Sequence, residues 1–63
     1  MNHSLYIKRK ESKLYQRDVA KKLGIHEQSY YRKETGQLPF TIPEGLMLAK
    51  IFDCTLNDLF GGE

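Results

Sequence analysis

The chain has 63 residues, of which 40% are hydrophobic and 29% are charged. This length predicts a single domain over residues 1–63, with a marginal core and little room for a large substrate or a bound dinucleotide. The lone cysteine, Cys54, excludes an internal disulfide framework. The net charge of +2 is uneven, because residues 1–37 carry nine basic and four acidic side chains, whereas residues 38–63 carry one and four. This division suggests an anionic partner for the basic part, but the charge alone favours the plainer interpretation, in which these side chains only solvate helix faces.

No stretch approaches the ~18 apolar residues of a membrane span, and no apolar run follows a basic start. We therefore expect no membrane span and no signal peptide. A free thiol without an export signal indicates a reducing, cytoplasmic environment.

Turn signals divide the chain into short helical patterns. The first follows Asn2 and Ser4, either of which could cap it, and ends near Ser12. The second covers residues 16–23 and carries one apolar stripe. Gly24 follows it at once, as a left-handed C-terminal cap requires.

The third pattern covers residues 27–34 and is closed by Gly36. Tyr30 is its expected inward residue, whereas Tyr31 is expected at the surface, and the remaining side chains are polar or amphipathic. Because so polar a helix cannot be held by burial alone, its surface predicts a contact with something else.

The fourth pattern opens with a capping box formed by Thr41 and Glu44 and has Pro43 in its first turn. It runs through Leu46, Ala49 and Phe52. Gly45 inside this helix costs about 1 kcal/mol relative to alanine. That cost predicts close packing at Gly45.

The fifth pattern starts at the cap residue Thr55 and ends before Gly61, with Leu56, Leu59 and Phe60 as apolar anchors. Five short helical patterns and no strand pattern predict an all-α fold, a compact five-helix bundle.

Residues 16–35 predict a helix-turn-helix, since only residues 24–26 separate the two helical patterns. Ala20 is small enough to let the two axes approach closely, and Gly24 takes the bend without hindrance from a β-carbon. Ile25 and Tyr30 would pack the second helix onto the first. In this motif the second helix enters the major groove of duplex DNA, with its N-terminal residues at the base edges.

An ordered series of motifs resembles the Cro/phage-repressor helix-turn-helix family, also called the XRE family. The motifs are residues 14–25, Tyr30, residues 34–36, residues 48–50 and residues 56–60. The segment 30–36, followed by Phe40 and Thr41, is most similar to small regulators of Gram-positive prophages and mobile elements. The resemblance covers about residues 4–60. It implies a lambda-repressor-like DNA-binding domain that binds double-stranded DNA sequence-specifically as a transcription regulator, most often a repressor.

The resemblance also implies which side chains meet DNA. Gln16, at the start of the second helix, matches a glutamine that contacts a phosphate and sometimes a base. Gln28 has the amide for a bidentate contact to adenine, Arg32 could reach guanine or a phosphate, and Glu27 could accept from cytosine or only favour the helix dipole. The expected DNA-binding residues are Gln16, Arg17, Glu27, Gln28, Ser29, Tyr31, Arg32 and Gln37.

A structural ion pair is implied as well. Arg9 and Glu34 match a pair that braces the first helix against the end of the third. Arg9 would then be shielded from DNA, which lowers the usable positive charge below the raw count.

Several positions depart from the family pattern. Tyr15 and His26 occupy N-caps where Ser, Thr or Asn is usual, so each cap is expected to be weaker by about 1 kcal/mol, although the Tyr15 hydroxyl could point at a phosphate. Lys33 replaces a usual apolar residue, and Gln37 replaces a usual lysine. Lys13 stands where glycine often turns the first helix into the second.

Other chemistry finds little support. His3, His26 and Cys54 lack metal-ligand spacing, and no nucleophile has a positioned base, so we expect no metal, no cofactor, no enzymatic activity and no small-molecule substrate. Cys54 is better interpreted as a small buried hydrophobe. The basic cluster at residues 8–10 fits a solvated helix face and a phosphate contact equally well.

One such domain contacts few bases, so useful specificity needs two copies on half-sites about 34 Å apart. We expect a homodimer that forms through the fourth and fifth helices or their loop, away from the basic face. The rival hypothesis is a helical protein–protein interaction module that modulates another regulator without binding DNA. Its motivation is that Glu27 and Lys33 fit poorly on a DNA-reading face.

Overall fold

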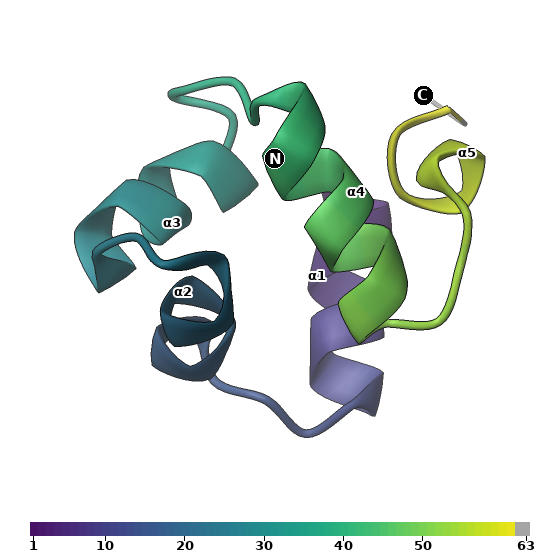
Figure 1. Cartoon of the computed structure of the whole chain (residues 1–63), viewed down its shortest axis with the longest axis horizontal. Coiled ribbons are helices and arrows are strands. Elements are labelled where there is room, and N and C mark those ends of the chain that lie inside the picture. The colour runs from purple at the N-terminus through teal and green to yellow at the C-terminus, as the bar shows by residue number, and fades with distance from the viewer. Residues whose placement is uncertain (62–63) are drawn as a thin grey trace.

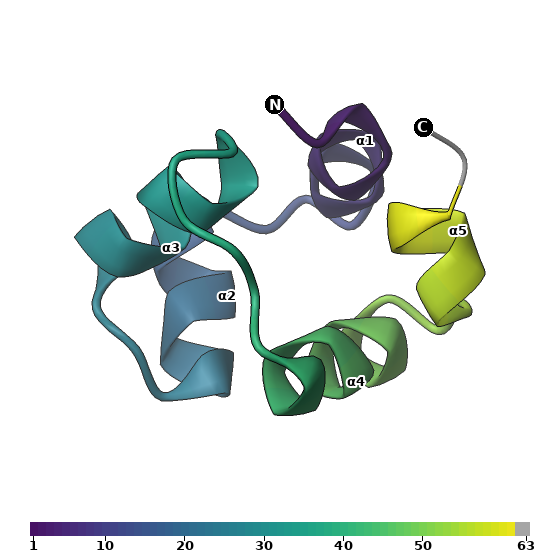
Figure 2. The same cartoon turned by 90° about the horizontal axis from the view of Figure 1, so that it is seen from above.

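The computed structural model describes residues 1–61, which form five helices and no strand. The helices are α1 (His3–Glu11), α2 (Gln16–Leu23), α3 (Glu27–Glu34), α4 (Ile42–Ile51) and α5 (Leu56–Phe60). The predicted all-α bundle is therefore confirmed for this part of the chain. The pair α2 and α3 forms one side of the molecule, and α5 lies at the other (Figure 1). Viewed from above, α1 and α4 lie on opposite sides of the core (Figure 2).

The helix starts are set by local caps. The Asn2 Oδ1 accepts the Leu5 N–H at 3.0 Å, so Asn2 rather than Ser4 caps α1. The predicted reciprocal capping box is present at the start of α4, and a second such box starts α5. Neither Tyr15 nor His26 supplies a side-chain acceptor at the start of α2 or α3. The side-chain caps that Ser, Thr or Asn would supply are thus lacking at these two positions.

Two left-handed residues turn the chain around α2. Gly24 follows α2 with φ of 75°, as its C-cap position predicts. Lys13 lies between α1 and α2 with φ of 58°, a conformation that disfavours a residue with a β-carbon. Lys13 therefore occupies the very turn for which glycine is the usual residue.

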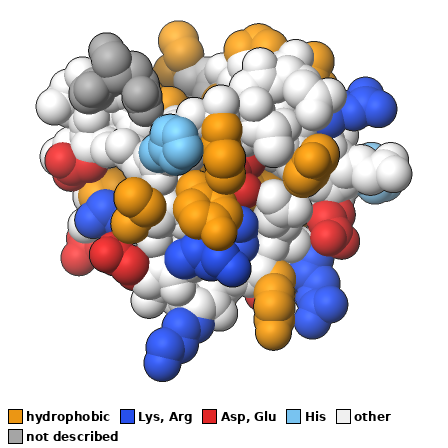
Figure 3. Space-filling model, turned by 180° about the vertical axis from the view of Figure 1, so that it is seen from behind, with side chains coloured by type: hydrophobic (Ala, Val, Ile, Leu, Met, Phe, Trp, Pro, Cys, Tyr) orange, Lys and Arg blue, Asp and Glu red, His pale blue; other side chains and the backbone are white. Residues whose placement is uncertain are grey.

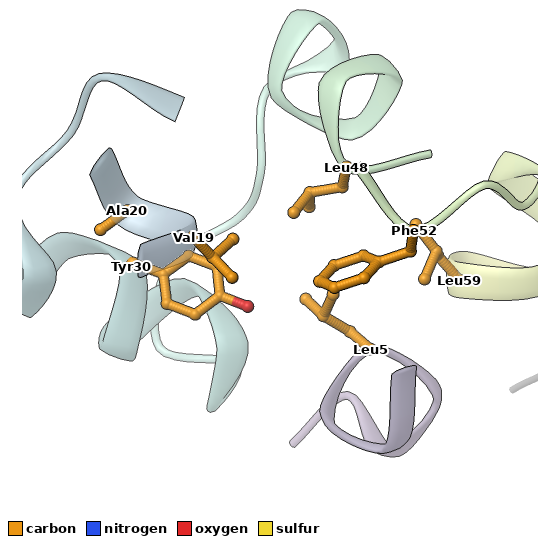
Figure 4. Close-up of a cluster of buried hydrophobic side chains, with 7 residues drawn as sticks. All are labelled: Leu5, Val19, Ala20, Tyr30, Leu48, Phe52 and Leu59. Atoms are coloured by element: carbon orange, nitrogen blue, oxygen red, sulfur yellow. The ribbon is translucent and has the colours of Figure 1, made fainter. Parts of the chain in front are cut away.

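The core joins the helix-turn-helix pair to the other three helices. Tyr30 of α3 and Val19 of α2 face a second group, which comes from α1, from α4 with its C-cap residue, and from α5 (Figure 4). Ala20 of α2 lies farther from that group. Ala20 is 2% exposed and Tyr30 is fully buried, so the predicted close crossing of α2 and α3 is confirmed. The buried hydrophobic residues are Leu5, Val19, Ala20, Tyr30, Leu48, Phe52 and Leu59.

The packing of α5 differs from the prediction that all three of its apolar residues are anchors. Leu59 is 1% exposed, but Leu56 and Phe60 are 40% and 36% exposed. A helix of five residues turns only one narrow face inward, which explains the difference. Leu56 and Phe60 instead lie beside Gly45, where an added β-carbon would meet their side chains at 3.3 and 3.5 Å. The close packing predicted at Gly45 is confirmed.

Candidate nucleic-acid interface

The outward face of α3 is polar and exposed. Glu27 and Tyr31 are one helical turn apart, as are Gln28 and Arg32, and all four side chains are exposed. At about 100° per residue, these four positions share one side of the helix, and Tyr30 lies on the other side. The structure therefore brings four of the predicted site residues onto one continuous surface.

The N-terminus of α2 lies close to the end of α3. Gln16 is half-buried, and its Nε2 donates to Glu34 Oε2 at 2.8 Å. One amide N–H of Gln16 is thus used inside the protein, and the amide carries a second N–H. Arg17, the next residue, is exposed.

Arg9 and Glu34 form a buried two-pronged ion pair behind this surface. Arg9 Nε lies 2.9 Å from Glu34 Oε1, and its Nη2 lies 3.2 Å from Oε2. The remaining Nη1 donates to the Leu14 carbonyl oxygen at 3.0 Å. Their side chains are 7% and 1% exposed. Arg9 ties α1 to the end of α3 and is turned away from solvent.

The Glu34 carboxylate is the centre of this network. Besides Arg9 and Gln16 it accepts the Tyr30 hydroxyl at 2.9 Å. Burial by itself raises the pKa of Glu34, but the donors from Arg9, Gln16 and Tyr30 outweigh it and hold that pKa below its usual range. Burial and the neighbouring Glu34 carboxylate raise the pKa of Tyr30. Glu34 therefore stays ionised and fixes both α2 and α3.

Three other residues of the α3 region lie off the exposed face. Ser29 is half-buried, and Gln37, in the loop after α3, donates from Nε2 to Thr35 Oγ1 at 3.2 Å. Lys33 is held within the protein, where its Nζ lies 2.6 Å from Glu44 Oε1. The interpretation of Lys33 as part of a poorly fitting DNA-reading face is wrong, because its side chain joins α3 to α4.

Comparison with known proteins now decides the family. A helix-turn-helix family model matches residues 5–59, which is most of the chain. The chain belongs to the Cro/C1-type helix-turn-helix family, or XRE family. This family is one of DNA-binding transcription regulators, and the chain is of that kind. No curated protein and no solved structure gives a significant match.

The basic cluster of α1 is divided in this Cro/C1-type protein. Arg9 is buried, Lys8 is half-buried and Lys10 is exposed. The guanidinium of Arg9 and the ammonium of Lys10 lie 5.5 and 5.7 Å from the Tyr6 ring centroid. On the rear face, basic, acidic and hydrophobic side chains are interspersed (Figure 3). That face is therefore a mixed surface without one continuous basic patch.

Residues 1–61 contain neither a helix that could span a membrane nor a cluster of side chains that could bind a metal. No helix in this range is long and apolar enough to cross a bilayer. In the same range, no three His, Cys, Asp or Glu residues are grouped so that they could hold a metal ion.

Several contacts of this Cro/C1-type domain have no signal in the sequence pattern. The Gln16–Glu34 hydrogen bond joins residues 18 positions apart, and the Lys33–Glu44 pair joins two helices across a loop. Asn2 also donates from Nδ2 to the Leu59 carbonyl oxygen at 3.0 Å. Periodicity and capping rules reach only a few residues along the chain, so they could not find these partners.

Proposed function

We propose that this Cro/C1-type protein reads operator DNA in the major groove with α3 and acts as a repressor by occupying the operator. The observation that carries the proposal is the exposed face of Glu27, Gln28, Tyr31 and Arg32. The buried contacts of Glu34 hold this face rigidly from behind. A polar face on a helix whose other side is fixed in a core suits direct readout of bases.

The proposed roles follow from side-chain chemistry. Gln28 makes a bidentate contact to adenine, Arg32 contacts guanine or a phosphate, and Glu27 accepts from cytosine. Gln16 and Arg17, at the start of α2, contact phosphates and set the register. The remaining proposed contacts, to the flanking backbone, come from Ser29, Tyr31 and Gln37.

A homodimer is part of the proposal, since one domain reads few base pairs. The support is the exposed apolar surface of α4, where Ile42 is 78% exposed, Leu46 52% and Met47 44%. Leu56 and Phe60 of α5 extend it with exposures of 40% and 36%. Two copies joined there would present two α3 helices to one operator. The proposed location of the protein is the cytoplasm, and its proposed genetic context is a prophage or mobile element.

The test is fluorescence anisotropy with mixed-sequence duplex DNA at about 50 and 200 mM salt, followed by selection of bound duplexes from a random pool. We expect weak binding to mixed DNA that falls steeply with salt, and a defined selected sequence. Gln28→Ala should relax the preference at one base pair, at a cost of about 1–3 kcal/mol on the selected site. Ile7→Ala, an uncharged change at a 52% exposed position of α1, is the control and should change neither the base preference nor the affinity.

Two results would contradict the proposal. No binding at about 50 mM salt would favour the rival, a module that acts on another regulator. An equal loss on every duplex from Gln28→Ala would remove the base-reading role of Gln28.

A further inference from the structure

Tyr15 and Arg17 form a cation–π pair at the start of α2. The guanidinium carbon of Arg17 lies 4.8 Å from the centroid of the Tyr15 ring. Tyr15 is 65% exposed, and Arg17 is exposed as well. A cation at this distance over an aromatic face is attracted by about 0.5–1 kcal/mol at an exposed site.

The fold makes little other use of these two side chains. Tyr15 gives no side-chain hydrogen bond to the start of α2, and the Asp18 carboxylate accepts its backbone N–H at 2.8 Å. Within residues 1–61, Arg17 takes part in neither an ion pair nor a hydrogen bond. Its charge also lies in the first turn of α2, where the helix dipole disfavours a cation. Arg9, by contrast, is buried and donates to Glu34 and to the Leu14 carbonyl oxygen.

The contact with Tyr15 uses none of the N–H donors of Arg17 in a hydrogen bond. A guanidinium is planar and carries its five N–H donors in that plane, and attraction to an aromatic ring does not require a hydrogen bond from them. A guanidinium fixed in this way can donate two parallel hydrogen bonds to a phosphate, and less side-chain entropy is lost on binding.

Its position suits such a contact. Arg17 follows Gln16, the residue proposed to contact a phosphate, and in helix-turn-helix proteins this helix crosses the DNA backbone. On this basis, which rests on the proposed function, we propose that Tyr15 is a positioning residue that orients Arg17 toward a phosphodiester of the bound duplex. Tyr15 thus acts on DNA through Arg17.

The test is a double-mutant cycle of DNA affinity and its salt dependence, with the selected duplex as probe. Tyr15→Ala should weaken binding about two- to fivefold per bound copy, and Tyr15→Phe, which keeps the ring, should leave it unchanged. Arg17→Ala should weaken binding at least as much and reduce the salt slope by about 1. When Arg17 is already alanine, Tyr15→Ala should cause no further loss of DNA affinity. Arg17→Lys should keep the salt slope but bind more weakly than the wild type.

The outcomes separate two kinds of failure. If the wild type does not bind duplex DNA, the proposed function falls, and this inference falls with it. If the wild type binds but Tyr15→Ala leaves DNA affinity unchanged, only the positioning role is overturned. The same holds if Tyr15→Ala lowers affinity equally in the wild-type and Arg17→Ala backgrounds. A loss in Tyr15→Phe equal to that in Tyr15→Ala would assign the effect to the hydroxyl and would also overturn it. Thermal unfolding of each variant checks that the exposed substitutions leave the fold intact.

Discussion

Lys33 of α3 and Glu44 of α4 form an ion pair of 2.6 Å, with only 13% and 14% of their side chains exposed. The same Glu44 oxygen accepts the Thr41 N–H at 2.9 Å, so one carboxylate both caps α4 and ties it to α3. The pair gives Lys33 a role inside the protein at a position where an apolar residue is usual. The rival interaction-module hypothesis thereby loses one of its two motivations and keeps only Glu27.

The first prediction concerns this pair. Glu44→Gln should lower the free energy of unfolding by about 1–3 kcal/mol, because it leaves a mostly buried ammonium without its counter-charge. Lys33→Met should cost less, since the methionine fills the same space and Glu44 keeps its bond to Thr41. Urea unfolding followed by circular dichroism measures both. A Lys33→Met variant that is less stable than Glu44→Gln would contradict the argument.

The second prediction is that the folded protein loses stability at low pH. Burial opposes ionisation of Glu34 and Glu44, but their donors outweigh it and lower both pKa values, and the Thr55 groups lower the pKa of Asp58. The unfolded chain therefore binds protons more readily at these three carboxylates. Their contribution to stability is complete above about pH 5 and is lost as the pH falls through 4.5 and below.

The measurement is the thermal midpoint between about pH 7 and pH 3. The wild-type midpoint should fall on the acid side, and Glu44→Gln should show a smaller fall because one of the responsible carboxylates is absent. An identical acid dependence in both proteins would remove Glu44 from the explanation.

The third prediction concerns the left-handed turns. Lys13→Gly should raise the free energy of unfolding by about 0.5–1 kcal/mol, because glycine adopts a φ of 58° without the β-carbon penalty. Gly24→Ala is the matched reverse case and should lower it by about 1 kcal/mol. Apart from its chain neighbours, nothing lies within 4 Å of a β-carbon built at Gly24, so the loss would come from the backbone conformation alone. Equal stability of all three proteins would refute the strain assigned to Lys13.

The fourth prediction concerns self-association. Leu46→Lys on the exposed face of α4 should shift a dimer toward monomer and weaken operator binding more than mixed-DNA binding, because only the operator needs both copies. Analytical ultracentrifugation gives the mass, and Ile7→Lys, which changes the 52% exposed Ile7 of α1, is the control. If the wild-type protein binds its operator as a monomer, the proposed dimer is wrong.

The helix boundaries and the inward position of Tyr30 followed from local rules. Period, cap residues and left-handed glycines act within about four positions of the chain, so residues such as Gly24 and Thr41 predict their own structure. Tyr30 in the core and Tyr31 at the surface follow from the same geometry, since neighbours on a helix diverge by about 100°. The family resemblance added the expectation that Arg9 and Glu34 meet.

Contacts between helices were decided by tertiary structure. The sequence by itself determined an all-α helix-turn-helix chain with an uneven charge, and the buried Arg9 shows that this charge overstates the cations left for DNA. Only the folded arrangement placed Gln16 against Glu34 and Lys33 against Glu44, and left Leu56 and Phe60 partly exposed. The physical reason is that such partners depend on how the helix axes cross, and that crossing is set by the packing of the whole core rather than by any short segment.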